Sequence, residues 1–335
     1  MSNVLVRFVL LAFVLISPAS AAEPIKLKLS FFSSDRSTTY LSSVKPFVDA
    51  VNGEAKGLIE IEVYFSGALG KLQAQQPYLV DDGVADIALV VVGQAPARFE
   101  DSAVIELPGL FHNATEATLT YSRLVAAGAL SGFESFFVIG AYTADPNSIH
   151  TRQSVATLAD LKSLKIRTNN MIEASALERL GVVPVVLPLP QTLDAISRGA
   201  IDGATMPPSV LVDFGVARVV NHHYLLHTSA APLALVMSRK KFDDLPEQAR
   251  AVIRKYSGEW FVAHYLERWE LLERQEIERL KLDPRRKVIL PSESDFDIAQ
   301  VAFGSVIDDW AATSAHNRDL LKLVRAELVK IRSRQ

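Results

Sequence analysis

The sequence has no cysteine among its 335 residues and no large excess of charge of either sign. The absence of cysteine excludes disulfides, thiol nucleophiles, iron–sulfur clusters and cysteine-liganded zinc. The 35 basic and 38 acidic residues give a formal net charge of −3. This balance argues against a nucleic-acid partner, because nucleic-acid-binding proteins usually carry a basic stripe.

After its first residues, the sequence also lacks any apolar run of the roughly 20 residues that a helix needs to cross a bilayer. The one long apolar run, Phe8–Ile16, follows Arg7 and is followed by small residues at 19–21. That order is typical of a cleaved secretory signal peptide. We therefore predict a signal peptide over residues 1–21 and export of the mature protein to the periplasm.

The rest of the chain has enough apolar residues to form a substantial core. The hydrophobic fraction of 49% excludes general disorder, and the length predicts two domains or one large domain. Strand patterns at 25–29, 58–65, 87–92 and 136–141 alternate with helix patterns at 38–51, 71–81 and 114–127. The segment Ile87–Val92 is apolar throughout, as expected of a strand buried on both faces of a parallel sheet.

A second unit of the same kind follows the turn-rich segment 145–148. Its predicted strands are 164–168, 183–187 and 201–204, and its predicted helices are 171–180 and 192–198. One more strand is predicted at 233–237. From Pro246 to Lys281 the pattern is helical, with a break near Ser257–Gly258, and further helices are predicted at 296–310 and 320–332. Strand–helix alternation is the α/β signature.

Two similar α/β units and a long helix that can lie across both predict a clamshell. We assign residues 22–147 and 233–280 to lobe I, and residues 148–232 and 281–335 to lobe II. Arg167 then lies at the carboxyl end of a strand, where ligands bind in open α/β sheets. Asn170 can cap the helix that follows, with Glu173 three residues on in the position of a capping box. Arg167 is either a solvated surface arginine or an anion-binding residue, and the spacing alone does not distinguish these two interpretations.

Several short motifs give the chain a resemblance to a known family. In order and spacing, from about Ala22 to Phe242 and more weakly beyond, the chain resembles the DctP family of TRAP (tripartite ATP-independent periplasmic) transporter solute-binding proteins. The segments that carry this resemblance are Ser66–Gly70, Asp82–Ala88, Glu106–Phe111, Leu158–Arg167, Leu180–Pro184, Gln191–Ala195, Gly199–Gly203 and Pro207. The resemblance implies a two-lobed periplasmic binding protein with Arg167 on the ligand carboxylate. It also implies that the membrane subunits of a TRAP transporter are its partners.

Departures from the family pattern bear on the ligand. Met206 replaces a frequent asparagine, Leu189 replaces a frequent aromatic residue, and Val90–Val92 replace polar contacts of sialic-acid-binding members. No second arginine lies near 144–145; Arg152 is the nearest. Each change leaves a ligand hydroxyl without a partner, at about 1–3 kcal/mol per group. We therefore expect an apolar or aromatic 2-oxo or 2-hydroxy monocarboxylate and not sialic acid.

The remaining candidate residues fall into two groups. A second polar contact to the ligand is assigned to one or more of Arg152, Asn169 and Asn170. The predicted cleft lining consists of Phe32, Ser33, Val92, Gly93 and Tyr142, together with Leu189 and Met206. Core packing is an equally good interpretation of Phe32 and of Tyr142.

No catalytic constellation can be assembled from the sequence. His222, His223 and His227 lack a standard zinc spacing, which favours packing over metal binding, and no nucleophile–base motif is present. We therefore predict no catalytic residue, no metal and no cofactor. Two alternatives to transport remain at this point: a sensory binding protein that presents its ligand to a receptor, and a periplasmic enzyme that acts on small organic acids.

Overall fold

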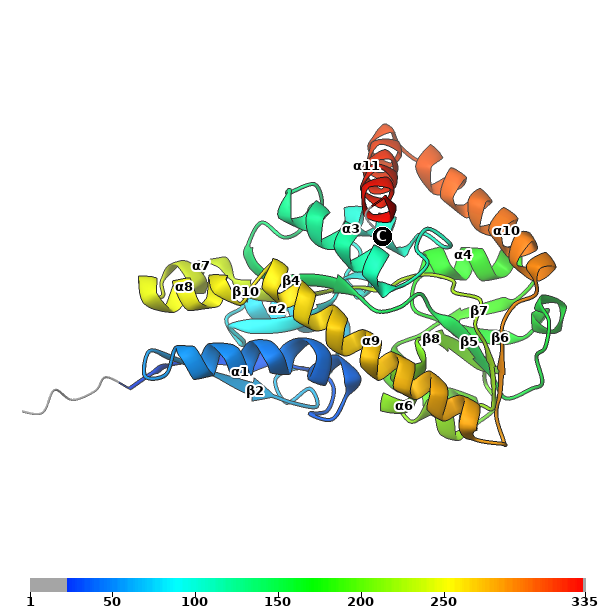
Figure 1. Cartoon of the computed structure of the whole chain (residues 1–335), viewed down its shortest axis with the longest axis horizontal. Helices are drawn as coiled ribbons and strands as arrows, with labels where there is room; N and C mark the ends of the chain where they lie inside the picture. Colours follow the sequence, from blue (N-terminus) through cyan, green and yellow to red (C-terminus); the bar gives the residue numbers. More distant parts are fainter. Residues whose placement is uncertain (1–22, 334–335) are drawn as a thin grey trace, which may run out of the picture.

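The structure is a computed structural model that describes residues 23–333, so the predicted signal peptide lies outside the described residues. Two β-sheets organise these residues (Figure 1). The first sheet has the strand order β2-β1-β3-β10-β4. Its strands are β1 (Ile25–Ser30), β2 (Ile59–Tyr64), β3 (Ile87–Val91), β4 (Phe136–Thr143) and β10 (Pro232–Ser238). Strand β10 is antiparallel to both of its neighbours, whereas β1 is parallel to β2 and to β3.

The second sheet has six strands in the order β11-β9-β5-β8-β6-β7. They are β5 (Ser148–Thr151), β6 (Lys165–Thr168), β7 (Val183–Val186), β8 (Gly203–Met206), β9 (His222–Tyr224) and β11 (Lys287–Ile289). Of these strands, β5, β9 and β11 were not predicted, because β9 and β11 have only three residues each and β5 begins within the turn-rich segment 145–148. We call the parts of the molecule built on the first and second sheets lobe I and lobe II.

Eleven α-helices lie within the described residues. They are α1 (Lys45–Glu54), α2 (Gln76–Asp81), α3 (Ala114–Ala126), α4 (Met171–Arg179), α5 (Thr192–Ser197), α6 (Pro208–Asp213), α7 (Arg239–Asp243), α8 (Glu247–Lys255), α9 (Glu259–Leu282), α10 (Glu293–Ala312) and α11 (Ala315–Arg332). None of the helices within 23–333 is both long enough and apolar enough to cross a membrane.

Apolar side chains on both faces of each sheet form the cores. All five residues of β3 are buried, as its unbroken apolar sequence predicts. One face of the first sheet packs against α1, α8 and α9, and the other packs against α3 and α11. In lobe II, α4 and α10 share a core with one face of the sheet, and α5 and α6 share a core with the other. The predicted α/β fold is confirmed.

The long helix α9 spans both lobes (Figure 1). It contacts α3 and β4 of lobe I, and α6 and β11 of lobe II. With 24 residues it is about 36 Å long. The break predicted near Gly258 is confirmed, because Gly258 is the N-cap of α9 and has a φ of 60°.

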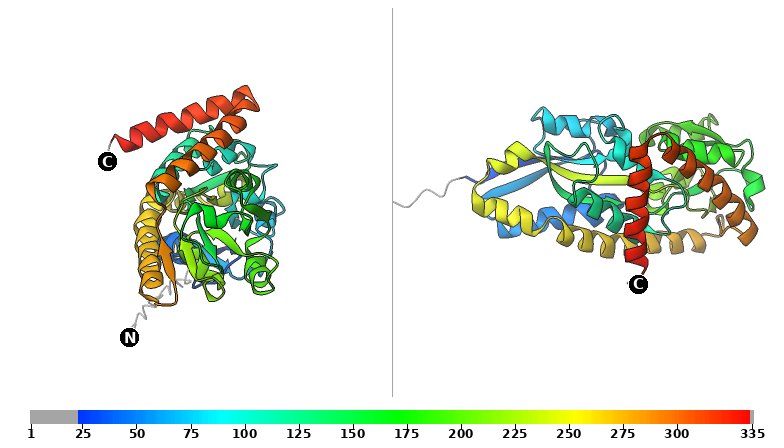
Figure 2. Two further views of the ribbon diagram at one scale, coloured as in Figure 1. Left: turned by 90° about the vertical axis from the view of Figure 1, so that its right-hand side faces the viewer. Right: turned by 90° about the horizontal axis from the view of Figure 1, so that it is seen from above.

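The C-terminal helix does not follow the predicted division of the chain. Residues 281–335 were assigned to lobe II, but α11 crosses back and packs against α3 and the 3-10 turn Glu100–Glu106 of lobe I (Figure 2). Its buried residues, such as Leu320, Val324 and Leu328, join the core that contains Tyr121. An amphipathic pattern shows that a helix has a buried face, but it does not show which lobe covers that face.

Two chain crossovers, residues 144–147 and 225–231, pass between the lobes side by side. Asn147 donates its backbone N–H to the carbonyl of Ser229 at 3.0 Å, and Thr228 donates its own to Asn147 at 2.8 Å. Away from the crossovers, Thr38 of lobe I donates its N–H to Asp213 of lobe II at 2.7 Å. Gln94 of lobe I donates its side-chain N–H to the carbonyl of Asn169 at 2.9 Å. The lobes are therefore held together both at the crossovers and across the space between them.

Gly140 of β4 provides the first test of this packing. A Cβ at position 140 would lie 2.2 Å from the ring of Phe261, which is buried on α9. We expect Gly140→Ala to lower the free energy of unfolding by about 1–3 kcal/mol, because the ring must move within a filled core. Urea denaturation followed by circular dichroism measures the change.

Gly304 offers a matched control on α10, where an added Cβ meets nothing within 4 Å. Gly304→Ala should raise stability by about 0.5–1 kcal/mol, because alanine favours a helix interior over glycine. Equal stabilities of the two variants would contradict the assigned packing of Phe261 against β4.

Asp213 provides a pH-dependent test of the contact between the lobes. Burial raises the pKa of Asp213 to about 6, although its hydrogen bonds from Thr38 act in the opposite direction. Because the folded state binds this proton more tightly than the unfolded chain does, the contribution of Asp213 to stability is full below pH 3.8 and is lost as the pH rises through about 6. Asp213→Asn keeps an oxygen for the Thr38 N–H and should remove this part of the pH dependence.

The measurement is the difference in free energy of unfolding between wild type and Asp213→Asn from pH 4 to pH 8. We expect the wild type to lose stability relative to the variant as the pH rises from 4 to 7. The exposed Asp297, replaced by asparagine, is the control. If the difference does not change with pH, Asp213 does not titrate as assigned.

Candidate ligand-binding site

A small cavity of about 70 Å³ lies between the lobes, several times the space that one water molecule needs. Lobe I contributes Phe32, Val91, Tyr142 and Leu233, and α9 contributes Tyr265 and Trp269. Lobe II contributes Arg167 from β6, Thr205 and Met206 from β8, and Leu189, Pro207, Val210 and Phe214 from the segments that follow strands. The other lining residues are Thr39, Gln73, Ala144, Asn147, Asn169 and Ala231. Of these described lining residues, Arg167 alone carries a charge.

Arg167 lies at the carboxyl end of β6, and only 2% of it is exposed. Its guanidinium donates from Nε to the carbonyl of Leu187 at 2.9 Å, from Nη1 to the carbonyl of Thr205 at 3.4 Å and from Nη2 to Asn169 Oδ1 at 3.2 Å. A guanidinium has five N–H donors, so Nη1 and Nη2 each keep one N–H that no described residue accepts. Two such donors match the two oxygens of a carboxylate.

Glu173 supplies the negative charge that balances Arg167. Its carboxylate is completely buried and accepts four hydrogen bonds. One oxygen accepts from Asn147 Nδ2 at 2.9 Å and from Thr228 Oγ1 at 2.6 Å, and the other accepts from Thr205 Oγ1 at 2.7 Å and from the Asn169 N–H at 3.2 Å. Burial lowers the pKa of Arg167 to about 10, although the charge of Glu173 acts in the opposite direction. Arg167 therefore remains a cation at neutral pH.

Asn169 and Asn170 lie next to each other and have different surroundings. The Asn169 side chain accepts from Arg167, while its buried Nδ2 has no hydrogen-bond partner within residues 23–333. Asn170 caps α4 as predicted and accepts from the Glu173 N–H at 2.8 Å. The predicted capping box is not formed, because the Glu173 carboxylate accepts from Asn169 instead. Asn169 lines the cavity, and Asn170 is not among its lining residues.

The structure brings six of the predicted site residues together around the cavity: Phe32, Tyr142, Arg167, Asn169, Leu189 and Met206. Four further candidates, in addition to Asn170, lie elsewhere. Arg152 donates to the carbonyl of Ile196 at 3.0 Å, and Ser33 accepts through its carbonyl from Ser66. Val92 is packed in the core of lobe I.

Gly93 packs closely against a buried carboxyl group and is not among the residues that line the cavity. A Cβ on Gly93 would lie 1.9 Å from Glu106 Oε1, so the glycine makes room for that side chain. Burial, together with the nearby charge of Glu173, raises the pKa of Glu106 to about 8. Val92 and Gly93 turn away from the predicted position because the chain enters a 3-10 turn, Val92–Gln94, directly after β3.

Sequence reasoning missed several cavity residues, among them Gln73, Asn147 and Trp269. Gln73 lies in the 3-10 turn Gln73–Gln75 and Asn147 lies in a crossover, where no periodicity shows the direction of a side chain. Trp269 lies on α9, where a helical pattern predicts a buried face but no cavity. It is buried, with Nε1 donating to Asp145 at 2.8 Å, and it also lines the cavity.

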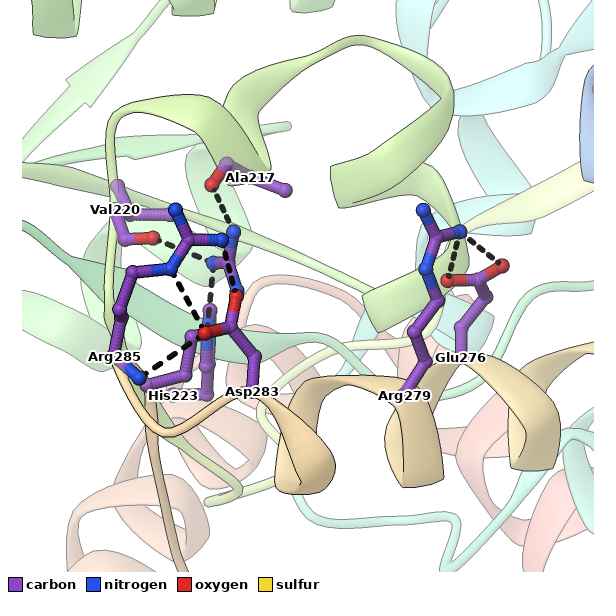
Figure 3. Close-up of polar contacts among 8 residues, drawn as sticks. Ala217, Val220, His223, Glu276, Arg279, Asp283 and Arg285 are labelled. Atoms are coloured by element: carbon purple, nitrogen blue, oxygen red, sulfur yellow. Dashed lines mark hydrogen bonds and ion pairs between the residues drawn. The ribbon is translucent and has the colours of Figure 1, made fainter.

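Of the histidines noted in the sequence, His223 is a fully buried residue of lobe II. His223 pairs with His150 across β5 and β9, with 2.9 Å between the two Nδ1 atoms. Burial lowers the pKa of His150 to about 4 and that of His223 to about 2. Arg286 donates to the carbonyls of Val220 and Ala217, and its Nη1 lies 3.4 Å from Nε2 of His223 (Figure 3). No group of three or more potential metal ligands occurs in the described part of the chain.

The chain was compared with known families and proteins. The model of bacterial extracellular solute-binding protein family 7, DctP, matches residues 31–313. A curated relative, the 2,3-diketo-L-gulonate-binding periplasmic protein YiaO of Escherichia coli, is 25% identical over 232 residues, covering 68% of this chain and 70% of its own.

Two solved structures of TRAP solute-binding proteins are similar over their whole length. One, from a marine metagenome, is specific for aromatic acid ligands and contains metahydroxyphenylacetate; it is 26% identical, with a TM-score of 0.85, and the match covers 91% of this chain and 99% of that one. The other, from Rhodoferax ferrireducens, contains copurified benzoate; it is 26% identical, with a TM-score of 0.82 and coverages of 91% and 98%.

The family match, the two lobes and the cavity between them all indicate a solute-binding protein. Proteins of this family bind solutes and are not enzymes, and the aligned structures share both lobes with this chain. The chain therefore belongs to bacterial extracellular solute-binding protein family 7, the DctP family of TRAP solute-binding proteins.

Proposed function

We propose that this protein captures an aromatic monocarboxylate between its lobes and delivers it to the membrane subunits of a TRAP transporter. The charge of the cavity carries this proposal. Arg167 is the one charged side chain among the described lining residues, and it keeps an N–H on each of two nitrogens for an acceptor. A single carboxylate can accept from these two N–H groups, whereas a second would find no cation among the described lining residues, and burying it would be costly.

The walls of the cavity favour a flat, apolar ligand body. Phe32, Tyr142, Tyr265, Phe214 and Trp269 surround it. The hydroxyls of Tyr142 and Tyr265 already donate to Ser43 Oγ and to the Thr143 carbonyl. Their rings therefore present mainly apolar surface to the ligand, and aromatic surfaces pack well against one another. The similar proteins that contain benzoate and metahydroxyphenylacetate support this class of ligand.

The cellular setting of this function is the part of the proposal that rests on the family and on the sequence of the first residues. We infer that the leader at 1–21 directs export to the periplasm, where the mature chain binds its solute. The lobe boundaries given above stand as part of this proposal, except that α11 belongs with lobe I in packing.

The test is binding by calorimetry, with benzoate, phenylacetate, mandelate and phenylpyruvate compared against galacturonate and gulonate. At least one aromatic acid should bind with micromolar affinity or better, and the sugar acids should bind at least tenfold more weakly. Native mass spectrometry of the freshly purified protein identifies any copurified acid. Tighter binding of the sugar acids would contradict the proposal.

Arg167→Lys keeps the positive charge but removes the planar pair of donors. We expect the affinity for the best aromatic acid to fall about 100-fold, because charge-assisted hydrogen bonds are worth about 1.5–3 kcal/mol each. Calorimetry of the variant checks this, with thermal melting to confirm that it is folded.

Arg152→Lys is the matched control, because Arg152 lies outside the cavity and donates to a backbone carbonyl. Its affinity should match that of the wild type within about threefold. An Arg167→Lys variant that retains wild-type affinity, or an equal loss in Arg152→Lys, would refute the assigned role of Arg167.

A further inference from the structure

Gln73 is a buried polar residue that the carboxylate site leaves unexplained. It lies in lobe I between β2 and α2, is 7% exposed and lines the cavity. Its side-chain oxygen is buried without a hydrogen-bond partner within residues 23–333. Arg167 lies on lobe II, so the two residues line the cavity from opposite lobes.

The nearby Gln76 shows that a buried glutamine in this segment can have its side-chain amide fully hydrogen-bonded. Gln76 is also buried, but it accepts from Ser30 Oγ at 2.8 Å and donates to the Gly70 carbonyl at 2.8 Å. Gln76 is therefore a structural residue that ties α2 to the sheet. Gln73 has no such role, and an unpaired buried amide oxygen is costly.

A bound solute can supply the missing partner. Because Arg167 is the one charged group of the described lining, the solute group that meets Gln73 must be neutral. The Gln73 amide has an oxygen that accepts and an NH₂ group that donates. A hydroxyl on the solute can donate to that oxygen or accept from that NH₂ group. A hydroxyl therefore satisfies Gln73 whichever way its amide is turned.

We propose that Gln73 is a specificity-determining residue that binds a hydroxyl on the part of the ligand remote from its carboxylate. The preferred solute is then a hydroxy-substituted aromatic monocarboxylate, held by Arg167 at its carboxylate and by Gln73 at its hydroxyl. This inference rests on the proposed function, because it takes the carboxylate to lie on Arg167.

The experiment compares benzoate with 3-hydroxybenzoate and 4-hydroxybenzoate by calorimetry on the wild type and on Gln73→Met, which has a similar length and no amide. The wild type should bind at least one hydroxybenzoate about tenfold more tightly than benzoate. In Gln73→Met this ratio should fall to about one, because the hydroxybenzoate is weakened while benzoate is unchanged or bound more tightly. Gln75→Met, in the same turn but exposed, should keep the wild-type ratio.

The ratio of hydroxybenzoate to benzoate affinity is measured on one protein, so a general loss of stability in a variant does not change it. The preference of the wild type can be measured without any variant. Equal wild-type affinities for all three acids, or a ratio that survives in Gln73→Met, would overturn the role of Gln73 while leaving the proposed function intact. If these three acids fail to bind but phenylacetate, mandelate or phenylpyruvate binds, the role of Gln73 is overturned and the proposed function stands. If none of the aromatic acids binds, the proposed function fails and this inference fails with it.

Discussion

The burial of one charge pair, Arg167 and Glu173, is the constraint on which the site depends. A guanidinium that is 2% exposed needs a nearby negative charge. Here that charge is supplied indirectly, because Glu173 reaches Arg167 through Thr205 and Asn169, each of which also accepts from the guanidinium. The carboxylate thus balances the cation without occupying its two outward N–H groups. A direct bidentate pair would satisfy the charge equally well but would leave nothing for a ligand.

The same carboxylate also connects the site to the crossovers between the lobes. Glu173 accepts from Asn147 in one crossover and from Thr228 in the other, and these two residues are joined by a backbone hydrogen bond. Removing one member of a buried charge pair costs about 3–5 kcal/mol, so the position of α4 relative to both crossovers is strongly defined. Closure contacts such as Thr38 with Asp213 lie away from this point. The lobes are thus joined at two places, by the hydrogen-bonded crossovers next to Glu173 and by contacts such as Thr38 with Asp213 across the space between them.

Much of this architecture could be predicted from the sequence, and the reasons differ from element to element. Four features follow from the residues of a single strand or a single helical turn. They are the buried strand β3, the break at Gly258, the cap at Asn170 and the position of Arg167 at a strand end. The cavity residues Gln73 and Asn147 could not be found in this way, because irregular segments have no period that fixes the direction of a side chain. Gly93 was misplaced for a different reason. The space beside it is filled by Glu106, which is distant in sequence.

The proposed choice among solutes depends on the polar atoms of the lining that are already hydrogen-bonded as well as on the free N–H groups of Arg167. The polar atoms of Tyr142, Tyr265 and Trp269 are already paired with Ser43, Thr143 and Asp145. A hydroxyl-rich solute would therefore leave several of its own groups unpaired, at about 1–3 kcal/mol for each. Two or three such groups would cost as much as the carboxylate bonds to Arg167 contribute. The proposed preference for aromatic over sugar acids therefore needs no steric barrier, because aromatic side chains whose polar atoms are already paired would discriminate against a hydroxyl-rich solute.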